Sequence, residues 1–422
     1  MTNKLTHFFE DREYLLLDEN NREYLEKLNG IWQFSYQENR ILIRIARDLE
    51  TWDEGALAEY WEGEASENPG GKNEKEKYFK KLNQSWNRLK DNPKSYTDFH
   101  HEKIKHTAPG FLALKDERTI LGDCPVASSK TRCCNLKTLD AVINCGFDCT
   151  YCSIQSFYHD DHILFHKNIK EKLQKLKLDP EKKYHIGTGQ SSDSLMWGNK
   201  EGILEEVIEF ARENPNVILE LKTKSDNITD LLKLQVPPNV LATWSLNTQT
   251  VISSEERLTA SLEQRLNAAR KVADRGIPVG FHLHPMVWYE GWKAEYQEMI
   301  DRITAMFSPE EVVTISLGTL TFIKPVLKLL RKRPIKSKIL QMPMDEAAGK
   351  WSYPLSIKQE LFRTAYEAFK PWHESVYFYM CMEDPSLWKA VFGREYPSNE
   401  NFEEDMLYTY HRKIKEIARR NA

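Results

Sequence analysis

The sequence predicts an α/β fold in which parallel strands alternate with helices and the sheet is closed or partly closed as a barrel. From about residue 138 onward, short apolar segments rich in β-branched residues occur at regular intervals, as expected of parallel strands buried on both faces. Amphipathic helical segments lie between them. Strand–helix repeats of this kind form a parallel sheet with right-handed crossovers, and 422 residues are enough for two domains.

Six strands are predicted, at residues 139–144, 184–187, 217–221, 240–245, 277–282 and 312–317. The helix after the fourth strand begins with a capping box, Ser261-x-x-Gln264, and ends at Gly276 before Pro278. In such folds the reactive groups lie at the carboxyl ends of the strands, so we expect the functional residues there.

The first 120 residues differ from the rest of the chain. They are rich in charged and aromatic residues, contain helical stretches at 40–49 and 74–89, and carry no recognisable chemical motif. We therefore expect three parts, namely a helical accessory region (1–120), the barrel (121–340) and a C-terminal α+β segment on the substrate side (341–422).

Composition limits the partners and the compartment. The net charge is −4, so any nucleic-acid surface must be a local patch. No apolar run is long enough to cross a membrane. The chain begins Met-Thr-Asn-Lys without an apolar signal region, so we expect a cytoplasmic protein whose seven cysteines are thiols or metal ligands.

Three of these cysteines form the motif Cys145-x3-Cys149-x2-Cys152 directly after the first predicted strand. This triplet predicts a [4Fe-4S] cluster held by three thiolates, with a fourth iron left open to bind a small molecule. A zinc site is the main alternative and would need a second ligand pair, such as Cys133-Cys134. Disulfides would require an oxidising compartment.

The aromatic residue Tyr151 completes the pattern C-x3-C-x-Φ-C, which resembles the signature of radical S-adenosylmethionine (SAM) enzymes. The resemblance implies that the open iron binds the amino acid part of SAM. One electron then cleaves SAM to a 5′-deoxyadenosyl radical, which abstracts hydrogen. Tyr151 is therefore a candidate for both the cofactor site and the catalytic site.

The second strand is followed by Gly187-Thr188-Gly189-Gln190-Ser191-Ser192-Asp193. Gly187 and Gly189 would let the backbone approach a ligand closely, while Ser192 and Asp193 offer polar groups to an amino acid zwitterion. We predict that these four residues bind the cofactor; the alternative is an ordinary tight turn.

Three further cofactor-binding candidates follow the next strands. Lys224 could neutralise the cofactor carboxylate, or be a solvated loop charge. Ser245 and Asn247 suit ribose hydroxyls, or form an Asx turn. The fifth strand carries His282 and His284 on one face; we expect these to be hydrogen-bonded core or site histidines rather than metal ligands.

The order of these motifs resembles the spore photoproduct lyase family over roughly residues 120–395. The matching elements are the cysteine triplet, Ser-Asp after the second strand, Thr-Lys after the third, Trp-Ser-Leu-Asn at the fourth and Gly-Ile-Pro-Val-Gly-Phe-His at the fifth. The resemblance implies a partial (β/α)6 TIM-type barrel of the radical SAM type. It also implies a lyase that repairs a thymine dimer, 5-thyminyl-5,6-dihydrothymine, in DNA, with a reducing partner such as flavodoxin or ferredoxin.

The chain departs from the family at two positions. Where the family has a hydrogen-donating cysteine, this chain has Gln190, and where it has a tyrosine after the last cluster cysteine, this chain has Ser153. Cys381, near the C-terminal end, is our candidate for a replacement donor. The alternatives for function are a radical SAM enzyme with a peptide or small-molecule substrate, and a zinc-stabilised nucleic-acid-binding protein without catalysis.

Residues 324–338 contain seven Lys or Arg and no acidic residue. Such a run is either a solvated helix face or a surface for a phosphate backbone. The nearby aromatics Trp351 and Tyr353 could stack an extruded base.

Overall fold

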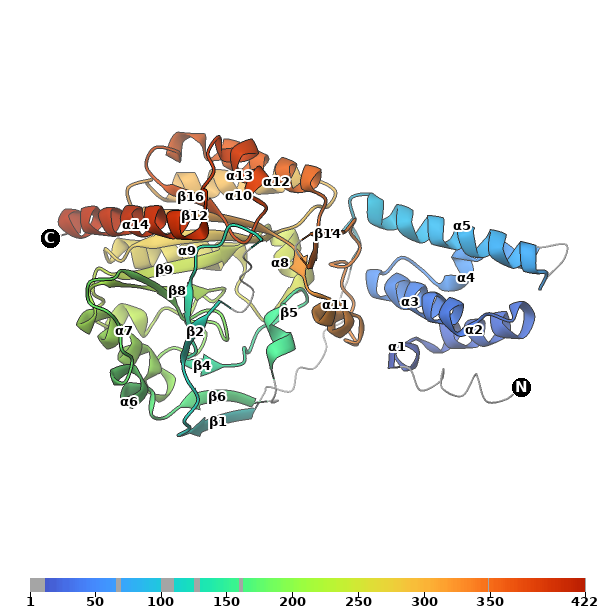
Figure 1. Cartoon of the computed structure of the whole chain (residues 1–422), viewed down its shortest axis with the longest axis horizontal. Coiled ribbons are helices and arrows are strands. Elements are labelled where there is room, and N and C mark those ends of the chain that lie inside the picture. Colours follow the sequence, from blue (N-terminus) through green and yellow to red (C-terminus); the bar gives the residue numbers. More distant parts are fainter. Residues whose placement is uncertain are drawn as a thin grey trace.

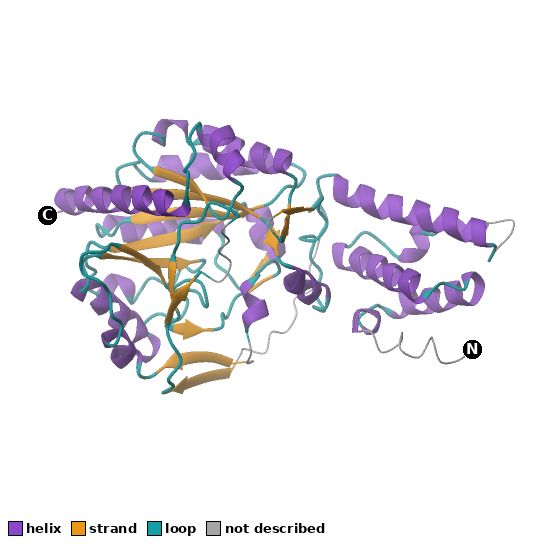
Figure 2. Ribbon diagram, in the orientation of Figure 1, coloured by secondary structure: helices purple, strands orange, loops and turns teal. Residues whose placement is uncertain are grey.

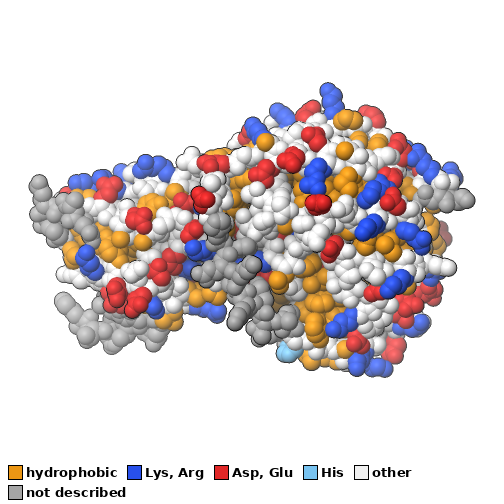
Figure 3. Space-filling model, turned by 180° about the vertical axis from the view of Figure 1, so that it is seen from behind, with side chains coloured by type: hydrophobic (Ala, Val, Ile, Leu, Met, Phe, Trp, Pro, Cys, Tyr) orange, Lys and Arg blue, Asp and Glu red, His pale blue; other side chains and the backbone are white. Residues whose placement is uncertain are grey.

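A computed structural model describes residues 12–65, 70–99, 110–124, 130–158, 162–347 and 349–421. Figure 1 shows a helical unit at the N-terminal end beside a larger unit built around a curled sheet. No helix among the described residues is both long enough and apolar enough to span a membrane. Positive and negative side chains are interspersed on the face drawn in Figure 3, in keeping with the small net charge of −4.

The main sheet has eight strands in the order β16-β12-β11-β9-β8-β7-β3-β2, and only β2 runs antiparallel to its neighbour. It curls into a partial barrel with helices around its outside (Figure 2), which confirms the predicted fold class. Its strands are β2 (Leu121–Asp123), β3 (Lys137–Leu139), β7 (Tyr184–Gly187), β8 (Val217–Thr223), β9 (Val240–Leu246), β11 (Val279–Met286), β12 (Val312–Thr319) and β16 (Tyr377–Met380).

Two strand predictions need correction. The predicted strand at 139–144 is divided, because β3 ends at Leu139 and a tight turn follows, in which Ala141 N donates to Leu139 O. The rest is β4 (Val142–Ile143), which pairs with β6 (His162–His166) in a small sheet with β1 (Gly110–Leu114). The prediction also missed β16, which adds a seventh parallel strand and places the end of the chain beside the site.

Helices cover the sheet between the strands. The capping box at the start of α9 is confirmed, since Ser261 Oγ accepts from Gln264 N (3.2 Å) and Ser261 N donates to Gln264 Oε1 (2.8 Å). The helices of this unit are α6 (Ile169–Gln174), α7 (Ile203–Glu213), α8 (Gln249–Glu255), α9 (Leu262–Asp274), α10 (Trp292–Met306), α11 (Lys324–Arg331), α12 (Leu355–Ala368), α13 (Pro385–Phe392) and α14 (Asn399–Asn421).

The N-terminal unit is helical, as predicted, and has a hydrophobic core of its own that includes Trp32 and Trp61. Trp52, at the end of α3, belongs instead to the core of the barrel unit. One fully buried aromatic side chain therefore anchors the helical unit to the barrel. The helices are α1 (Arg12–Leu15), α2 (Glu19–Trp32), α3 (Tyr36–Trp52), α4 (Leu57–Tyr60) and α5 (Lys72–Asp91).

The basic run forms much of the contact between the two units. Three of its side chains pair with acidic residues of the helical unit: Arg331–Asp48 (3.3 Å), Lys336–Asp53 (2.6 Å) and Lys338–Glu54 (2.5 Å). A fourth, Arg333, pairs with Asp148 of the cysteine loop.

The structure therefore assigns these four basic residues to internal ion pairs, so neither alternative, a solvated helix face or a phosphate-binding surface, holds for them. Lys324, Lys328 and Lys332 are exposed, so they are the charges of the run that can still face a nucleic acid.

The domain boundaries can be placed more closely. β1 pairs with β6, so residues 110–114 of the predicted accessory region pack with the barrel unit. β16, from the predicted C-terminal segment, completes the main sheet. We propose that the boundary of the helical unit lies after Asp91, where α5 ends.

Lys94 follows this boundary and is buried, with only 1% of its surface exposed. Its Nζ donates to Lys338 O (2.9 Å), and burial lowers its pKa to about 7. The unfolded chain therefore binds more protons than the folded protein between about pH 7 and the ordinary lysine pKa, so this group makes stability rise with pH in that interval.

We expect the Lys94→Met variant to lack this rise. Between pH 7 and pH 9 the unfolding free energy of the unchanged protein should gain about 2 kcal/mol relative to the variant. Urea unfolding at both pH values measures the difference, with the exposed Lys80→Met on α5 as control. Parallel pH profiles for Lys94→Met and the unchanged protein would contradict the assignment.

Candidate functional site

A cavity of about 270 Å³ opens at the carboxyl ends of the barrel strands. Its wall is formed by the carboxyl ends of β8, β9, β11 and β12 and by the loops after β7, β8, β12 and β16, together with the cysteine loop after β4. Ten of the twelve predicted site residues line it: Cys145, Cys149, Tyr151, Cys152, Gly189, Ser192, Asp193, Lys224, Ser245 and Cys381.

The cysteine loop is held from two sides. β5 (Asp148–Cys149) pairs with β10 (Glu256–Arg257), which sets Cys149 opposite Glu256. On the other side Gly146 packs against Met196 and Trp197, and a Cβ on this glycine would lie 2.5 Å from Met196 Cε. A side chain at position 146 would therefore push the loop away from the barrel.

The cysteine triplet lines the cavity without the second cysteine pair that a zinc site would need. Burial raises the pKa of Cys149 to about 12, even though Lys224 acts to lower it. A thiolate at Cys149 thus needs a positive charge beside it, such as a bound metal supplies. Within the described part of the chain, no three His, Cys, Asp or Glu side chains converge on one ion. Cys133 and Cys134, the second pair that a zinc site would need, do not line the cavity.

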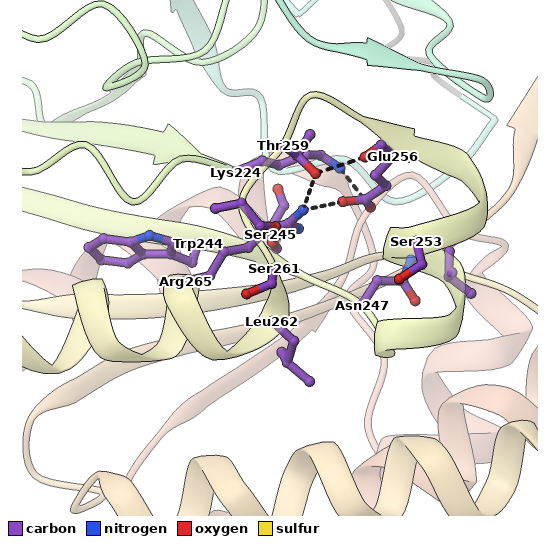
Figure 4. A network of polar contacts seen from close by, with 12 residues as sticks. Lys224, Trp244, Ser245, Asn247, Ser253, Glu256, Thr259, Ser261, Leu262 and Arg265 are labelled. Carbon is purple, nitrogen blue, oxygen red and sulfur yellow. Dashed lines mark hydrogen bonds and ion pairs between the residues drawn. The ribbon is translucent and has the colours of Figure 1, made fainter. Parts of the chain in front are cut away.

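A buried carboxylate, Glu256, fixes the residues beside the thiols (Figure 4). Lys224 Nζ donates to Glu256 Oε1 (3.2 Å) and to the hydroxyl of Tyr151 (2.7 Å). The Tyr151 hydroxyl in turn donates to Glu256. From the other side, Arg265 Nη2 donates to Glu256 Oε2 (2.5 Å), and Arg265 Nη1 donates to Ser245 O (2.9 Å).

Glu256 is ionised in this network. Burial alone would raise its pKa, but Arg265, Lys224 and Tyr151 outweigh burial and lower it to about 2. Lys224 is therefore held by a carboxylate of the protein, and a bound carboxylate would share it with Glu256. That Lys224 binds the cofactor stays a prediction.

Glu256 and Arg265 were not among the site residues predicted from the sequence. A signal was present, because Arg265 lies on the apolar face of α9, beside Leu262 and Leu266. A charged residue within such a stripe indicates a buried partner.

Three other residues predicted to bind the cofactor make contacts within the protein instead. The Asp193 carboxylate accepts from Leu195 N, Met196 N, Lys224 N and Thr223 Oγ1 at 2.7–3.0 Å. Asn247 is fully buried and does not line the cavity; its amide bonds Pro285 O and the Tyr296 hydroxyl, both at 2.8 Å. Gly187 packs near Leu136, away from the cavity wall. These contacts organise the strand ends.

The two aromatic residues expected to stack a base differ in their exposure. Tyr353 is buried, and its hydroxyl accepts from Trp288 N (3.1 Å), so it is a core residue and cannot stack an extruded base. Trp351 is half-buried in β15 (Lys350–Ser352). The two positions that depart from the family, Gln190 and Ser153, both line the cavity.

Comparison with known proteins decides the family. The sequence model described as "Spore photoproduct lyase" matches residues 135–363, more than half of the chain. The chain belongs to the spore photoproduct lyase family. The matched segment contains the cysteine triplet, whereas Cys381 and the helical unit lie outside it.

Curated relatives named spore photoproduct lyase agree with this assignment. The protein of Clostridium acetobutylicum is 26% identical over 221 residues, which are 51% of this chain and 64% of the relative. The protein of Bacillus subtilis is 26% identical over 215 residues, 49% of this chain and 62% of the relative. The chain thus matches less than two thirds of the length of either relative.

Solved structures show the same fold. A spore photoproduct lyase complexed with dinucleoside spore photoproduct superposes with a TM-score of 0.57 at 19% identity, covering 72% of this chain and 94% of that one. A doubly substituted spore photoproduct lyase with bound AdoMet and dinucleoside spore photoproduct gives the same values.

The buried network yields a prediction. In Glu256→Gln the neutral amide leaves Arg265 as a buried, uncompensated charge, so we expect the unfolding free energy to fall by about 3 kcal/mol. Denaturant unfolding measures the loss. Glu360→Gln is the control, because Glu360 pairs with Lys293 at the surface, where ion pairs contribute about 0–1 kcal/mol. Equal losses in the two variants would contradict a special role for Glu256.

Proposed function

We propose that this protein is a radical SAM enzyme that carries a [4Fe-4S] cluster, cleaves SAM and acts on a DNA photolesion. The supporting observation is the convergence of three thiols, Lys224 and Cys381 on one cavity at the carboxyl ends of the strands. Membership of the spore photoproduct lyase family supports it, as does the related structure of a spore photoproduct lyase with bound AdoMet and dinucleoside spore photoproduct.

Cys145, Cys149 and Cys152 would hold the cluster. When bound, the cluster supplies one electron that cleaves SAM to a 5′-deoxyadenosyl radical. Gly189 lines the cavity and would present its backbone to the cofactor. It also packs tightly on β8, because a Cβ there would lie 2.6 Å from Lys222 O. Lys224 and Ser245 would face its polar groups. A flavodoxin- or ferredoxin-type protein would supply the electron, and we expect the protein to work in the cytoplasm, where thiols stay reduced.

Cys381 is suited to return hydrogen to the substrate. It directly follows β16 and lines the same cavity as the cysteine loop. Burial raises its pKa, so the sulfur keeps its hydrogen near neutral pH. In the proposed step the S–H bond breaks, the hydrogen atom forms a C–H bond with the substrate radical, and a thiyl radical remains on Cys381. The amide N–H bonds of Gln190 are too strong to serve this way.

One observation favours a smaller substrate, such as a peptide or metabolite. Four residues of the basic run are paired within the protein, which reduces the charge available for a phosphate backbone. The activity test below separates these substrates from DNA.

The proposal is tested by incubating the anaerobically reconstituted protein with SAM, dithionite and ultraviolet-irradiated spore-type DNA. We expect 5′-deoxyadenosine and restored thymine, and neither product from Cys149→Ala, which should also lose iron because one thiolate ligand is absent. Full iron content in Cys149→Ala would contradict the cluster assignment. Formation of 5′-deoxyadenosine without thymine on any DNA would indicate a different substrate.

The role of Cys381 is tested in D2O, where its thiol exchanges to S–D. We expect the restored thymine to carry one deuterium from solvent, and Cys381→Ala to lose most of this label and to form radical by-products. Mass spectrometry of the products in thiol-free buffer measures both. Cys124→Ala, a cysteine that does not line the cavity, is the control. Unchanged label in Cys381→Ala would rule out this donor.

A further inference from the structure

Helix α11 carries a stripe of three exposed lysines, which we call the lysine stripe. Lys324, Lys328 and Lys332 are spaced by four residues, so they lie on one face of the helix. Val326 and Leu330, which point elsewhere, are buried. Within the described part of the chain, no acidic side chain pairs with any of the three lysines. A cationic patch of this kind, on a chain whose net charge is −4, fits an acidic partner.

The side of α11 that faces the protein lies against the cysteine loop. α11 is next to η2 (Ile154–Phe157), a turn that begins two residues after Cys152. Two residues beyond the end of α11, Arg333 Nη1 donates to Cys149 O (3.3 Å), and the same guanidinium pairs with Asp148. Because a helix with its side chains is about 10 Å across, the lysine stripe lies about one helix diameter from the loop that bears the thiols.

The cysteine loop separates α11 from the cavity. Cys149, Cys152 and Ile154 line the cavity, whereas no residue of α11 does. The barrel and β10 hold the loop from two other sides. Substrate and cofactor would reach the thiols through the cavity. An electron donor that docks on α11 would approach the same thiols from outside the cavity and leave its opening clear.

We propose that the lysine stripe of α11 is the docking surface for an acidic one-electron donor of the flavodoxin or ferredoxin class. The inference rests on the proposed function, because such a donor is needed only if the thiols hold a cluster. One electron passes from the redox centre of the donor to the cluster; no bond forms or breaks, and no proton moves. Electron-transfer complexes have small, short-lived interfaces, and charges at such an interface orient the partner and speed its association.

The position of the stripe favours a protein donor over a nucleic acid. A phosphate backbone that presents a base to the cavity has to run along the cavity opening, and no lysine of the stripe lines that cavity. The cations that would have lengthened the patch, Arg331, Lys336 and Lys338, are paired with the helical unit. What is left is a short patch beside the thiol-bearing loop.

The docking surface is tested first by binding. In the variant with Lys324→Gln, Lys328→Gln and Lys332→Gln, glutamine keeps a good helix propensity and removes the charge. We expect its affinity for an acidic flavodoxin, and in parallel for an acidic ferredoxin, to fall about tenfold at low salt, the effect of three exposed charge pairs. At about 0.15 M salt the difference from the unchanged protein should shrink, because salt screens exposed charges. Isothermal titration of the anaerobic, cluster-loaded protein measures both affinities.

Electron delivery gives a second readout. With reduced flavodoxin as the donor, 5′-deoxyadenosine formation by the triple-glutamine variant should slow to a similar extent. With dithionite, which needs no docking surface, its rate and its iron content should be unchanged. Arginine at the same three positions should restore binding, since it keeps the charge. The matched control is Lys175→Gln, Lys177→Gln and Lys182→Gln, because these exposed lysines follow α6, which lies across the barrel unit from α11 (Figure 1).

The outcomes separate the docking surface from the proposed function. Equal affinity of the triple-glutamine variant and the unchanged protein for both donors would overturn the docking surface. A variant that loses affinity for duplex DNA but is reduced normally by flavodoxin would also overturn it, because the stripe would then serve the nucleic acid. Stripe-dependent donor binding by a protein that forms no 5′-deoxyadenosine with dithionite would refute the proposed function and leave the docking surface standing.

Discussion

The geometry of the site depends on the buried charge of Glu256. This carboxylate accepts from Arg265, Lys224 and Tyr151, and its backbone pairs with Cys149 of the cysteine loop. One residue thereby ties the thiol-bearing loop, the end of β8 and helix α9 into a single unit. Because a buried carboxylate is stable only with all of its partners in place, the network defines where the thiols lie before any cofactor binds.

The helical unit reduces the positive charge that the surface of the barrel can offer to a nucleic acid. Arg331, Lys336 and Lys338 pair with its acidic residues, and Trp52 inserts into the barrel core. In Figure 1, helix α11 lies at the boundary between the two units. Basic residues that would have formed a continuous patch are thus divided between internal contacts and solvent, so any surface for nucleic acid is smaller than the sequence suggests.

The interior of the barrel is polar where a parallel barrel is usually filled by aliphatic side chains. His282 and Ser316 replace apolar residues on neighbouring strands, and Glu220 satisfies two histidines at once. A continuous polar line of this kind is costly unless each member is bonded. The line ends at the cavity wall, which His284 lines.

By itself, the sequence determined the alternation of strands and helices, the capping box at Ser261 and the cysteine triplet, because periodicity, capping and ligand spacing are local properties of the chain. The family likeness rested on the same local motifs. Only the tertiary structure decided that Asn247 faces the core, that Glu256 holds Lys224, and that the basic run docks a helical unit. Partners of a buried charge come from segments distant in the chain, so their pairing depends on how the elements pack, which no local pattern records.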